Sequence, residues 1–169
     1  MDTIDAIHTR RSIRRYTDKR VEAKLVEEIL RAAMQAPSAG NQQPWHFMII
    51  DDREILDKIP AVHPYAQMVR EAQVAILVCG DTSKELYEGY WVQDCSAATQ
   101  NLLLAAHALG LGAVWCGIYP RKERVDEFRK LFSLPTSVMP LALVPIGYPG
   151  EKKGREDRFK AERIHRNKW

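Results

Sequence analysis

A chain of 169 residues, of which 46% are hydrophobic and 28% charged, is long enough for one domain with a sizeable core and too short for two. The formal net charge is only +3, but residues 10–20 carry six Lys or Arg against one acid, and residues 151–169 carry eight against four. The remaining chain is mildly negative, which disfavours an extended nucleic-acid-binding surface. We therefore expect a single domain over residues 1–169 with positive charge at both ends.

Cysteine spacing and apolar runs narrow the protein class further. The three cysteines form no CxxC pair, and the first residues lack the basic-then-apolar pattern of a signal peptide, so we expect a cytoplasmic protein. The most apolar stretch, residues 102–119, is interrupted by His107 and three glycines, whereas a membrane-spanning helix needs about 20 apolar residues. It is interpreted as core, so we expect no membrane segment.

Helices and strands are predicted to alternate along the chain. In order, we expect a helix over 25–33, a strand over 45–50, a short helix over 51–59, a strand over 74–80, a long helix over 84–109, a strand over 112–118, a helix over 121–133 and a strand over 138–147. Pro140 and Pro145 predict that the last strand is an edge strand or contains a bulge. Alternation alone favours a parallel, doubly wound sheet.

The motif HTRRSIRRY, close to the N-terminus, has three interpretations. It could attract nucleic acid non-specifically, or it could be a solvated turn whose charges have no partner. It could also bind one phosphate monoester, through the Ser12 hydroxyl and the planar guanidinium groups of Arg10, Arg14 or Arg11. Arg158, in the basic C-terminal segment, would supply a further cation to such a site.

A second polar motif, APSAGNQQPWHF, lies between the first predicted helix and strand. Its small residues allow close approach of the backbone to a flat ligand, and Asn41, Gln42 and Gln43 supply both donors and acceptors. The alternative is ordinary turn chemistry, because Pro, Ser, Gly and Asn are the residues that turns prefer. That alternative leaves the series of three amides unexplained.

Other familiar site patterns are missing. In GLGAVWCGIYP, Gly110-x-Gly112 lacks the third glycine and the preceding strand of a dinucleotide-binding fingerprint. The five histidines form no HxxxH or HExxH motif, and no serine has an evident His and Asp partner. We therefore expect neither a zinc site nor a hydrolase, and we interpret His107 as a structural histidine and Cys95 and Cys116 as packing residues.

Four motifs, in order and over nearly the whole chain, resemble the FMN-dependent nitroreductase family, in its short-chain branch. They are RRSIRRY, APSAGNQQPWHF, GLGAVWCGIYP and the final PIGYPGEKKGREDRFKAERIHRNKW. The resemblance implies an α+β fold of three α-β-α layers around a mainly antiparallel sheet, against the parallel sheet favoured by alternation. It also implies a homodimer with FMN at the interface, in which the extension over 148–169 is exchanged with the partner subunit and gives the terminal tryptophan something to pack on.

The resemblance also assigns roles to residues of this chain. The FMN phosphate and ribityl end would be held by Arg10, Ser12, Arg14 and Arg158, with Arg11 as a neighbour. The flavin ring would meet Pro37, Ser38, Ala39 and Asn41 of the other subunit, the backbone N–H of Gly117 near N5, Trp115 and Cys116 at the adjacent wall, and Gln67 at the pyrimidine edge.

The activity implied by the resemblance is electron transfer by the flavin itself, so no catalytic side chain is required. NADH or NADPH would deliver a hydride to N5, and a nitroaromatic, quinone or other electron-poor small molecule would then take two electrons in ping-pong order. A flavin-binding protein without turnover, for storage or sensing, is the alternative. The short segment between the second strand and the long helix implies that a lid over the flavin is small or missing.

Overall fold

The computed structural model describes residues 1–169, and its centre is a five-stranded sheet. The strands are β1 (Trp45–Ile50), β2 (Val74–Asp81), β3 (Gly112–Ala113), β4 (Cys116–Gly117) and β5 (Val138–Gly147). They lie in the order β1-β2-β5-β3, with β4 also paired to β5, and every pairing is antiparallel.

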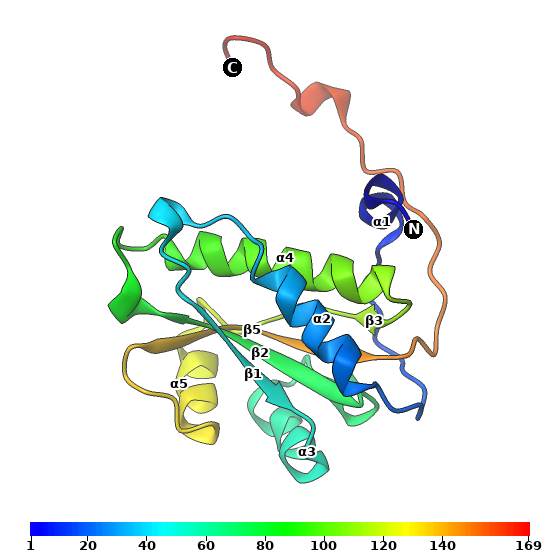
Figure 1. The fold of residues 1–169 in the computed structure, drawn as a ribbon, viewed down its shortest axis with the longest axis vertical. Helices are drawn as coiled ribbons and strands as arrows, with labels where there is room; N and C mark the ends of the chain where they lie inside the picture. Colours follow the sequence, from blue (N-terminus) through cyan, green and yellow to red (C-terminus); the bar gives the residue numbers. More distant parts are fainter.

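Helices cover both faces of this sheet (Figure 1). They are α1 (Thr3–Thr9), α2 (Ala23–Ala33), α3 (Arg53–Val62), α4 (Trp91–Ala108) and α5 (Lys122–Leu131), with single 3-10 turns at Ala39–Asn41, Gln67–Arg70, Thr82–Lys84 and Ala161–Arg163. Helices α2 and α4 lie on one face, and α3 and α5 on the other. The α+β class and the three α-β-α layers are therefore confirmed. None of the helices has the length and apolar character needed to cross a membrane.

Strand β2 shows how the sequence builds two cores at once. All eight of its residues are buried, and successive side chains point to opposite faces of the sheet. Val74, Ile76 and Val78 pack with α2 and α4, whereas Ala75 and Leu77 pack with α3 and α5. A continuous apolar run therefore becomes a central strand with a helical layer on each side.

The parallel sheet that alternation favoured is wrong, and the connection between β1 and β2 shows why. Helix α3 carries the chain away from the end of β1, and the irregular segment 63–73 brings it back to the same end of the sheet. Ile50, the last residue of β1, accordingly pairs with Ala75, near the start of β2. The alternation of helices and strands along the sequence does not show to which end of the sheet the chain returns after a helix. It therefore cannot distinguish a parallel from an antiparallel neighbour.

Three predicted boundaries also change. Helix α4 begins at Trp91 and not at residue 84, because Gly89 takes a positive φ of 83° that a helix does not allow. The expected strand over 112–118 is two short strands, both paired with β5. The last strand is an interior one, so only the bulge was correctly predicted: the register between β2 and β5 shifts beside Pro140.

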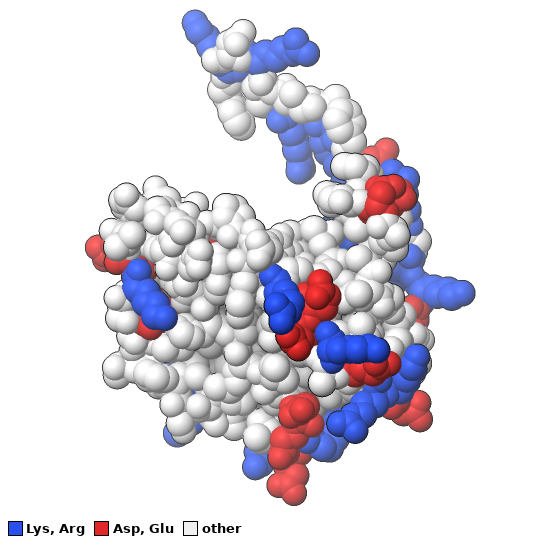
Figure 2. All heavy atoms as spheres, viewed as in Figure 1, with Lys and Arg blue, Asp and Glu red and all other residues white.

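Beyond Tyr148 the chain first runs beside the N-terminal segment, where Pro149 bridges to Tyr16, and then leaves the body of the protein (Figure 1). Every residue of 152–169 is exposed, including the large apolar side chains of Phe159, Ile164 and Trp169. Lys and Arg side chains also gather along this extension (Figure 2). The prediction that the extension packs on a partner subunit stays a prediction, and these exposed apolar side chains fit it.

Candidate functional site

The four arginines of the N-terminal motif separate into two kinds. The side chains of Arg11 and Arg15 have partners within the chain: Nε of Arg11 donates to the carbonyl oxygen of Gly154 at 2.8 Å, and Nε of Arg15 donates to the carboxylate of Glu71 at 3.0 Å. The guanidinium groups of Arg10 and Arg14, in contrast, take part in none of the hydrogen bonds and ion pairs of the chain. Their charges are therefore the ones left for a ligand.

Arg10 lies in a cleft of about 480 Å³ between the end of α1 and the C-terminal extension. The cleft is lined by Ile7, His8, Arg10, Arg11, Arg155, Glu156, Asp157, Arg158 and Phe159. Burial lowers the pKa of Arg10, and the neighbouring charges of Arg158 and Arg11 lower it further. A terminal nitrogen of Arg11 is also buried there without a hydrogen-bond partner. Like charges collected in one place are unfavourable unless an anion joins them, so the cleft is suited to a phosphate group.

The cleft also contains acidic side chains, which would compete with a phosphate for the arginines. Nε of Arg158 donates to Glu156 at 2.9 Å, and this pair lowers the pKa of the exposed Glu156 carboxylate. A phosphate would compete with Glu156 for the Arg158 guanidinium. Arg10 has no carboxylate partner of this kind, whereas the charge of Arg11 also acts on Glu156.

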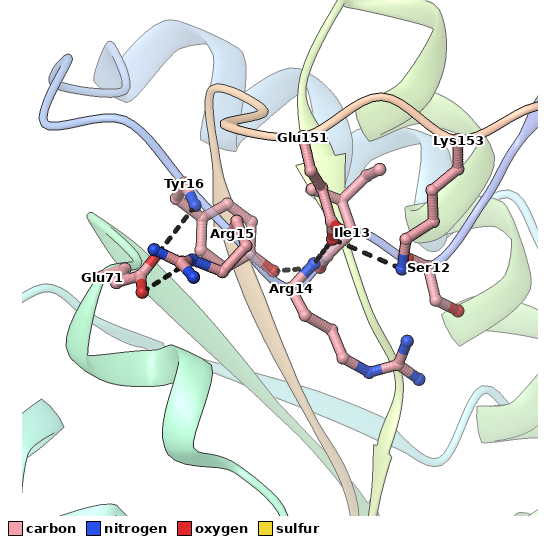
Figure 3. A network of polar contacts seen from close by, with 8 residues as sticks. All are labelled: Ser12, Ile13, Arg14, Arg15, Tyr16, Glu71, Glu151 and Lys153. Carbon is pink, nitrogen blue, oxygen red and sulfur yellow. Dashed lines mark hydrogen bonds and ion pairs between the residues drawn. The ribbon is translucent and has the colours of Figure 1, made fainter.

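Ser12 and Arg14 lie where the N-terminal segment crosses the sheet edge (Figure 3). The backbone of Ser12 bridges to Ala113, its carbonyl oxygen accepts from Nζ of Lys153 at 2.8 Å, and the backbone N–H of Arg14 donates to Glu151 at 2.6 Å. The Arg14 guanidinium points away from Glu151 (Figure 3). The basic extension is thus tied down at its root beside the arginine motif.

The electrostatics of strand β4 show where the Arg14 charge acts. Burial raises the pKa of the Cys116 thiol to about 11, while the positive charges of Arg14 and Arg124 oppose that rise. Arg14 is not among the charges that act on Arg10. Arg10, Arg11 and Arg158 thus line one cleft, and Arg14, whose charge acts on Cys116 of β4, is not among the residues that line it. The high pKa agrees with the prediction that Cys116 is a packing residue and not a redox centre.

Gly117 follows Cys116 and is open on one side. A Cβ atom built at this position would meet no atom within 4 Å, so the glycine leaves room for close approach of a flat ligand. Its carbonyl oxygen accepts two hydrogen bonds, from Nε2 of His63 at 3.0 Å and from Nη1 of Arg124 at 3.1 Å. Both donors escaped the sequence analysis, where His63 appeared only as one of five histidines outside any metal motif.

Gln67 and Trp115 are each next in sequence to a residue of the contact between Met68 and Cys116. Gln67 is exposed in the turn over Gln67–Arg70, where its side-chain nitrogen donates to the carbonyl oxygen of Pro64 at 3.2 Å. The neighbouring Met68 contacts the Cys116 thiol, with 3.8 Å between the sulfur atoms. Trp115 is exposed at the junction of β3 and β4.

The loop that contains Pro37, Ser38, Ala39 and Asn41 is held by a buried acid. Asp94, only 4% exposed, accepts hydrogen bonds from the backbone N–H of Ala39 at 2.9 Å and from the side-chain nitrogen of Gln42 at 2.6 Å. The Ser38 hydroxyl accepts from the N–H of Gln43 at 3.1 Å. Sequence reasoning missed Asp94, although a lone carboxylate among the apolar positions of a helix is a signal that could have found it.

The two halves of the expected site lie at opposite ends of α4 (Figure 1). Asp94, near the start of the helix, holds the loop before β1, whereas His107, near its end, contacts the Thr9 hydroxyl at 2.8 Å beside the arginine motif. Thirteen residues of helix separate these anchors by about 20 Å, at 1.5 Å per residue. The structure does not bring Pro37, Ser38, Ala39 or Asn41 to the arginine cleft of the same chain.

The protein is an antiparallel sheet between two helical layers. It has an arginine cleft at its edge and a loop of small residues at the far end of the central helix. Known proteins share this fold. The nitroreductase family model matches residues 7–63 and 59–148 of this sequence. The chain belongs to the nitroreductase family.

Individual relatives cover nearly the whole chain. A protein of Methanothermobacter thermautotrophicus, provisionally named NADH dehydrogenase/NAD(P)H nitroreductase, is 56% identical over 169 residues, which are 100% of this chain and 88% of the relative. A crystal structure from Parabacteroides distasonis with the same provisional name is 44% identical, with a TM-score of 0.95 over 99% of this chain and 98% of that one. A provisionally named nitroreductase from Desulfovibrio desulfuricans, solved in complex with FMN, is 37% identical, with a TM-score of 0.86 over 100% and 99% of the two chains.

Proposed function

We propose that this protein is an FMN-dependent oxidoreductase that transfers two electrons from NADH or NADPH to an electron-poor small molecule, such as a nitroaromatic or a quinone, in ping-pong order. The observation that carries the proposal is the cleft in which Arg10 lies beside Arg158 and Arg11, with one arginine nitrogen buried and unpartnered. Together with family membership and the relative solved with FMN, this favours a phosphate-bearing cofactor over a nucleic acid.

The residues of the chain divide the work of holding FMN. Arg10, with Arg158 and Arg11, would bind the phosphate together with Ser12, which lies beside β3, where its backbone bridges to Ala113. The Arg14 guanidinium would lie nearer the ring, because its charge acts on Cys116. Gly117 would admit the ring, with Trp115, Cys116 and Gln67 around it. FMN itself supplies the electron transfer, so these residues bind and orient and do not exchange electrons.

We further propose that the working protein is a homodimer. Pro37, Ser38, Ala39 and Asn41 lie about 20 Å along α4 from the arginine motif, so they would meet the ring held by the other subunit. The surface suits this arrangement: Ile4 and Ile7 of α1 and Met34 at the end of α2 are exposed, and Figure 2 shows a broad uncharged area over α4 and the loop before β1. The exposed extension over 148–169 would pack on the partner.

The first experiment is an absorbance spectrum of the purified protein, followed by heat release and identification of any chromophore. FMN bound and released, together with oxidation of NADH or NADPH in the presence of a nitroaromatic or quinone, is the expected result. A protein that neither carries nor takes up FMN would overturn the proposal. Stopped-flow mixing with NADPH and NADH tests turnover directly, because a storage protein would leave the flavin oxidised.

Mixed dimers test which subunit supplies which half of the site. A chain with Arg10→Met and a chain with Asp94→Ala each damage one half, and a two-fold dimer of the two would contain one intact site and one doubly damaged site. Purified mixed dimers are therefore expected to bind FMN at one of their two sites with wild-type affinity. If both halves came from one chain, both sites would be damaged and no wild-type affinity would return.

A further inference from the structure

The first turn of α5 contains a guanidinium that helix chemistry does not explain. A cation in the first turn of a helix is opposed by the helix dipole, and Arg124 lies there and takes part in none of the ion pairs of the chain. Arg124 is half-buried, and its only hydrogen bond runs from Nη1 to the carbonyl oxygen of Gly117. Four of its five N–H groups are therefore unused.

The hydrogen bond to Gly117 does not explain Arg124 either. Nε2 of His63 donates to the same oxygen, and His63 is 1% exposed, with its ring packed edge-on against Phe128 at 6.1 Å between centroids. The Gly117 oxygen thus has a second, buried donor. No carboxylate pairs with the charge of Arg124.

An exposed aromatic ring lies beside this charge. The Arg124 guanidinium is 5.3 Å from the centroid of the Tyr65 ring, and His63 meets the same ring edge-on at 6.5 Å. Tyr65 is nevertheless 73% exposed. A ring oriented by two neighbours and open to solvent on the rest of its surface can stack on a planar molecule.

The charged side chains that act on the buried groups beside Tyr65 are positive, and Arg124 acts on His63. The charges that act on the neighbouring Cys116 thiol are those of Arg14 and Arg124, and no carboxylate is among them. A guanidinium presents its N–H groups in a planar fork that matches the two oxygens of a carboxylate. The pair of an open ring and an unpaired guanidinium therefore matches an aromatic molecule that carries a carboxylate.

We propose that Arg124 and Tyr65 form an acceptor subsite beside Gly117 that selects aromatic electron acceptors bearing a carboxylate group. This inference rests on the proposed function, because it takes Gly117 as the residue beside the flavin ring. The acceptor ring would lie against Tyr65, and its carboxylate would accept hydrogen bonds from the free N–H groups of Arg124. The anion of the nicotinamide nucleotide is the other possible source of negative charge, and the test separates the two.

The main readout is binding, measured by calorimetric titration of the FMN-loaded protein with benzoate and with neutral benzyl alcohol, neither of which takes electrons from a flavin. Arg124→Gln is expected to lower the affinity for benzoate, relative to benzyl alcohol, about tenfold, which is the usual effect of losing one charge-assisted contact. Lys122→Gln is the matched control, because it removes one exposed charge two residues away and should leave the ratio unchanged. Arg124→Lys should give an intermediate ratio, and it replaces Arg124→Gln if that variant does not fold.

Kinetics provide the second readout. The ratio of kcat/KM for 4-nitrobenzoate to that for 4-nitrobenzyl alcohol should fall about tenfold in Arg124→Gln and stay constant in Lys122→Gln. Equal losses for both probes, a loss in the Lys122 control, or no measurable benzoate binding by the wild type would overturn the subsite. A loss confined to flavin reduction by NADH or NADPH would assign Arg124 to the donor and would also overturn it. Failure of the proposed function is distinguishable, since the wild type would then bind no FMN and turn over neither acceptor.

Discussion

Replacing Arg10 tests the phosphate cleft most directly. Arg10→Met keeps much of the aliphatic stem and removes the guanidinium, so the local packing at the end of α1 should survive. If Arg10 makes one charge-assisted contact with the phosphate, its loss removes about 1.5–3 kcal/mol, which raises the dissociation constant for FMN roughly tenfold to hundredfold. Arg14→Ala is expected to weaken FMN by a similar factor.

Although Arg10→Met should weaken FMN binding, it should raise the free energy of unfolding of the FMN-free protein. Burial, Arg158 and Arg11 all disfavour the charged form of Arg10 in the folded chain, so removing the charge relieves an unfavourable arrangement. Fluorescence titration with FMN and urea unfolding of the FMN-free protein measure the two effects separately, with Arg15→Met as the control that removes a charge paired with Glu71. Unchanged FMN affinity, or a clear loss of stability in Arg10→Met, would show that Arg10 is structural.

Three further outcomes are expected. Asp94→Ala should lower the free energy of unfolding by about 3 kcal/mol in urea, because two hydrogen bonds to a buried carboxylate are lost, whereas Asp126→Ala, at an exposed position of α5, should change it little. Cys116, with its pKa raised to about 11, should react with iodoacetamide far more slowly in the native protein than after unfolding. Burial is the main cause that lowers the pKa of His63 below its ordinary value of 6.5. The stability that His63 contributes is therefore complete above pH 6.5 and is lost as the pH falls below that value. His63→Gln should flatten the acid side of the stability profile, measured by urea unfolding at a series of pH values.

The sequence was sufficient for the strands that are continuous apolar runs. The apolar run over 45–50 became β1 with no change of boundary, and the buried run from Val74 became the central strand. The sequence did not predict that β2 runs antiparallel to β1, because the path of segment 63–73 depends on side chains that pack against one face of the sheet. The resemblance supplied the antiparallel sheet that periodicity could not. Gly89 indicated that the long helix starts later than residue 84, but the helical spacing of the apolar residues Leu86 and Tyr90 favoured the earlier start.

The amides of the loop before β1 show how far residue types alone can define a site. Gln42 uses both ends of its side chain inside the chain, since its nitrogen donates to Asp94 and its oxygen accepts from the N–H of Leu86 at 2.8 Å. Gln43 donates to the Asn41 side-chain oxygen at 2.8 Å, which leaves the Asn41 nitrogen free. Part of the series of amides therefore has a structural role, and the ligand interpretation stays a prediction for Asn41. Asp94 lies more than fifty residues along the sequence from the loop that it holds. No local sequence pattern could therefore distinguish an amide that holds the loop from an amide that binds a ligand, and only the tertiary contact with Asp94 makes that distinction.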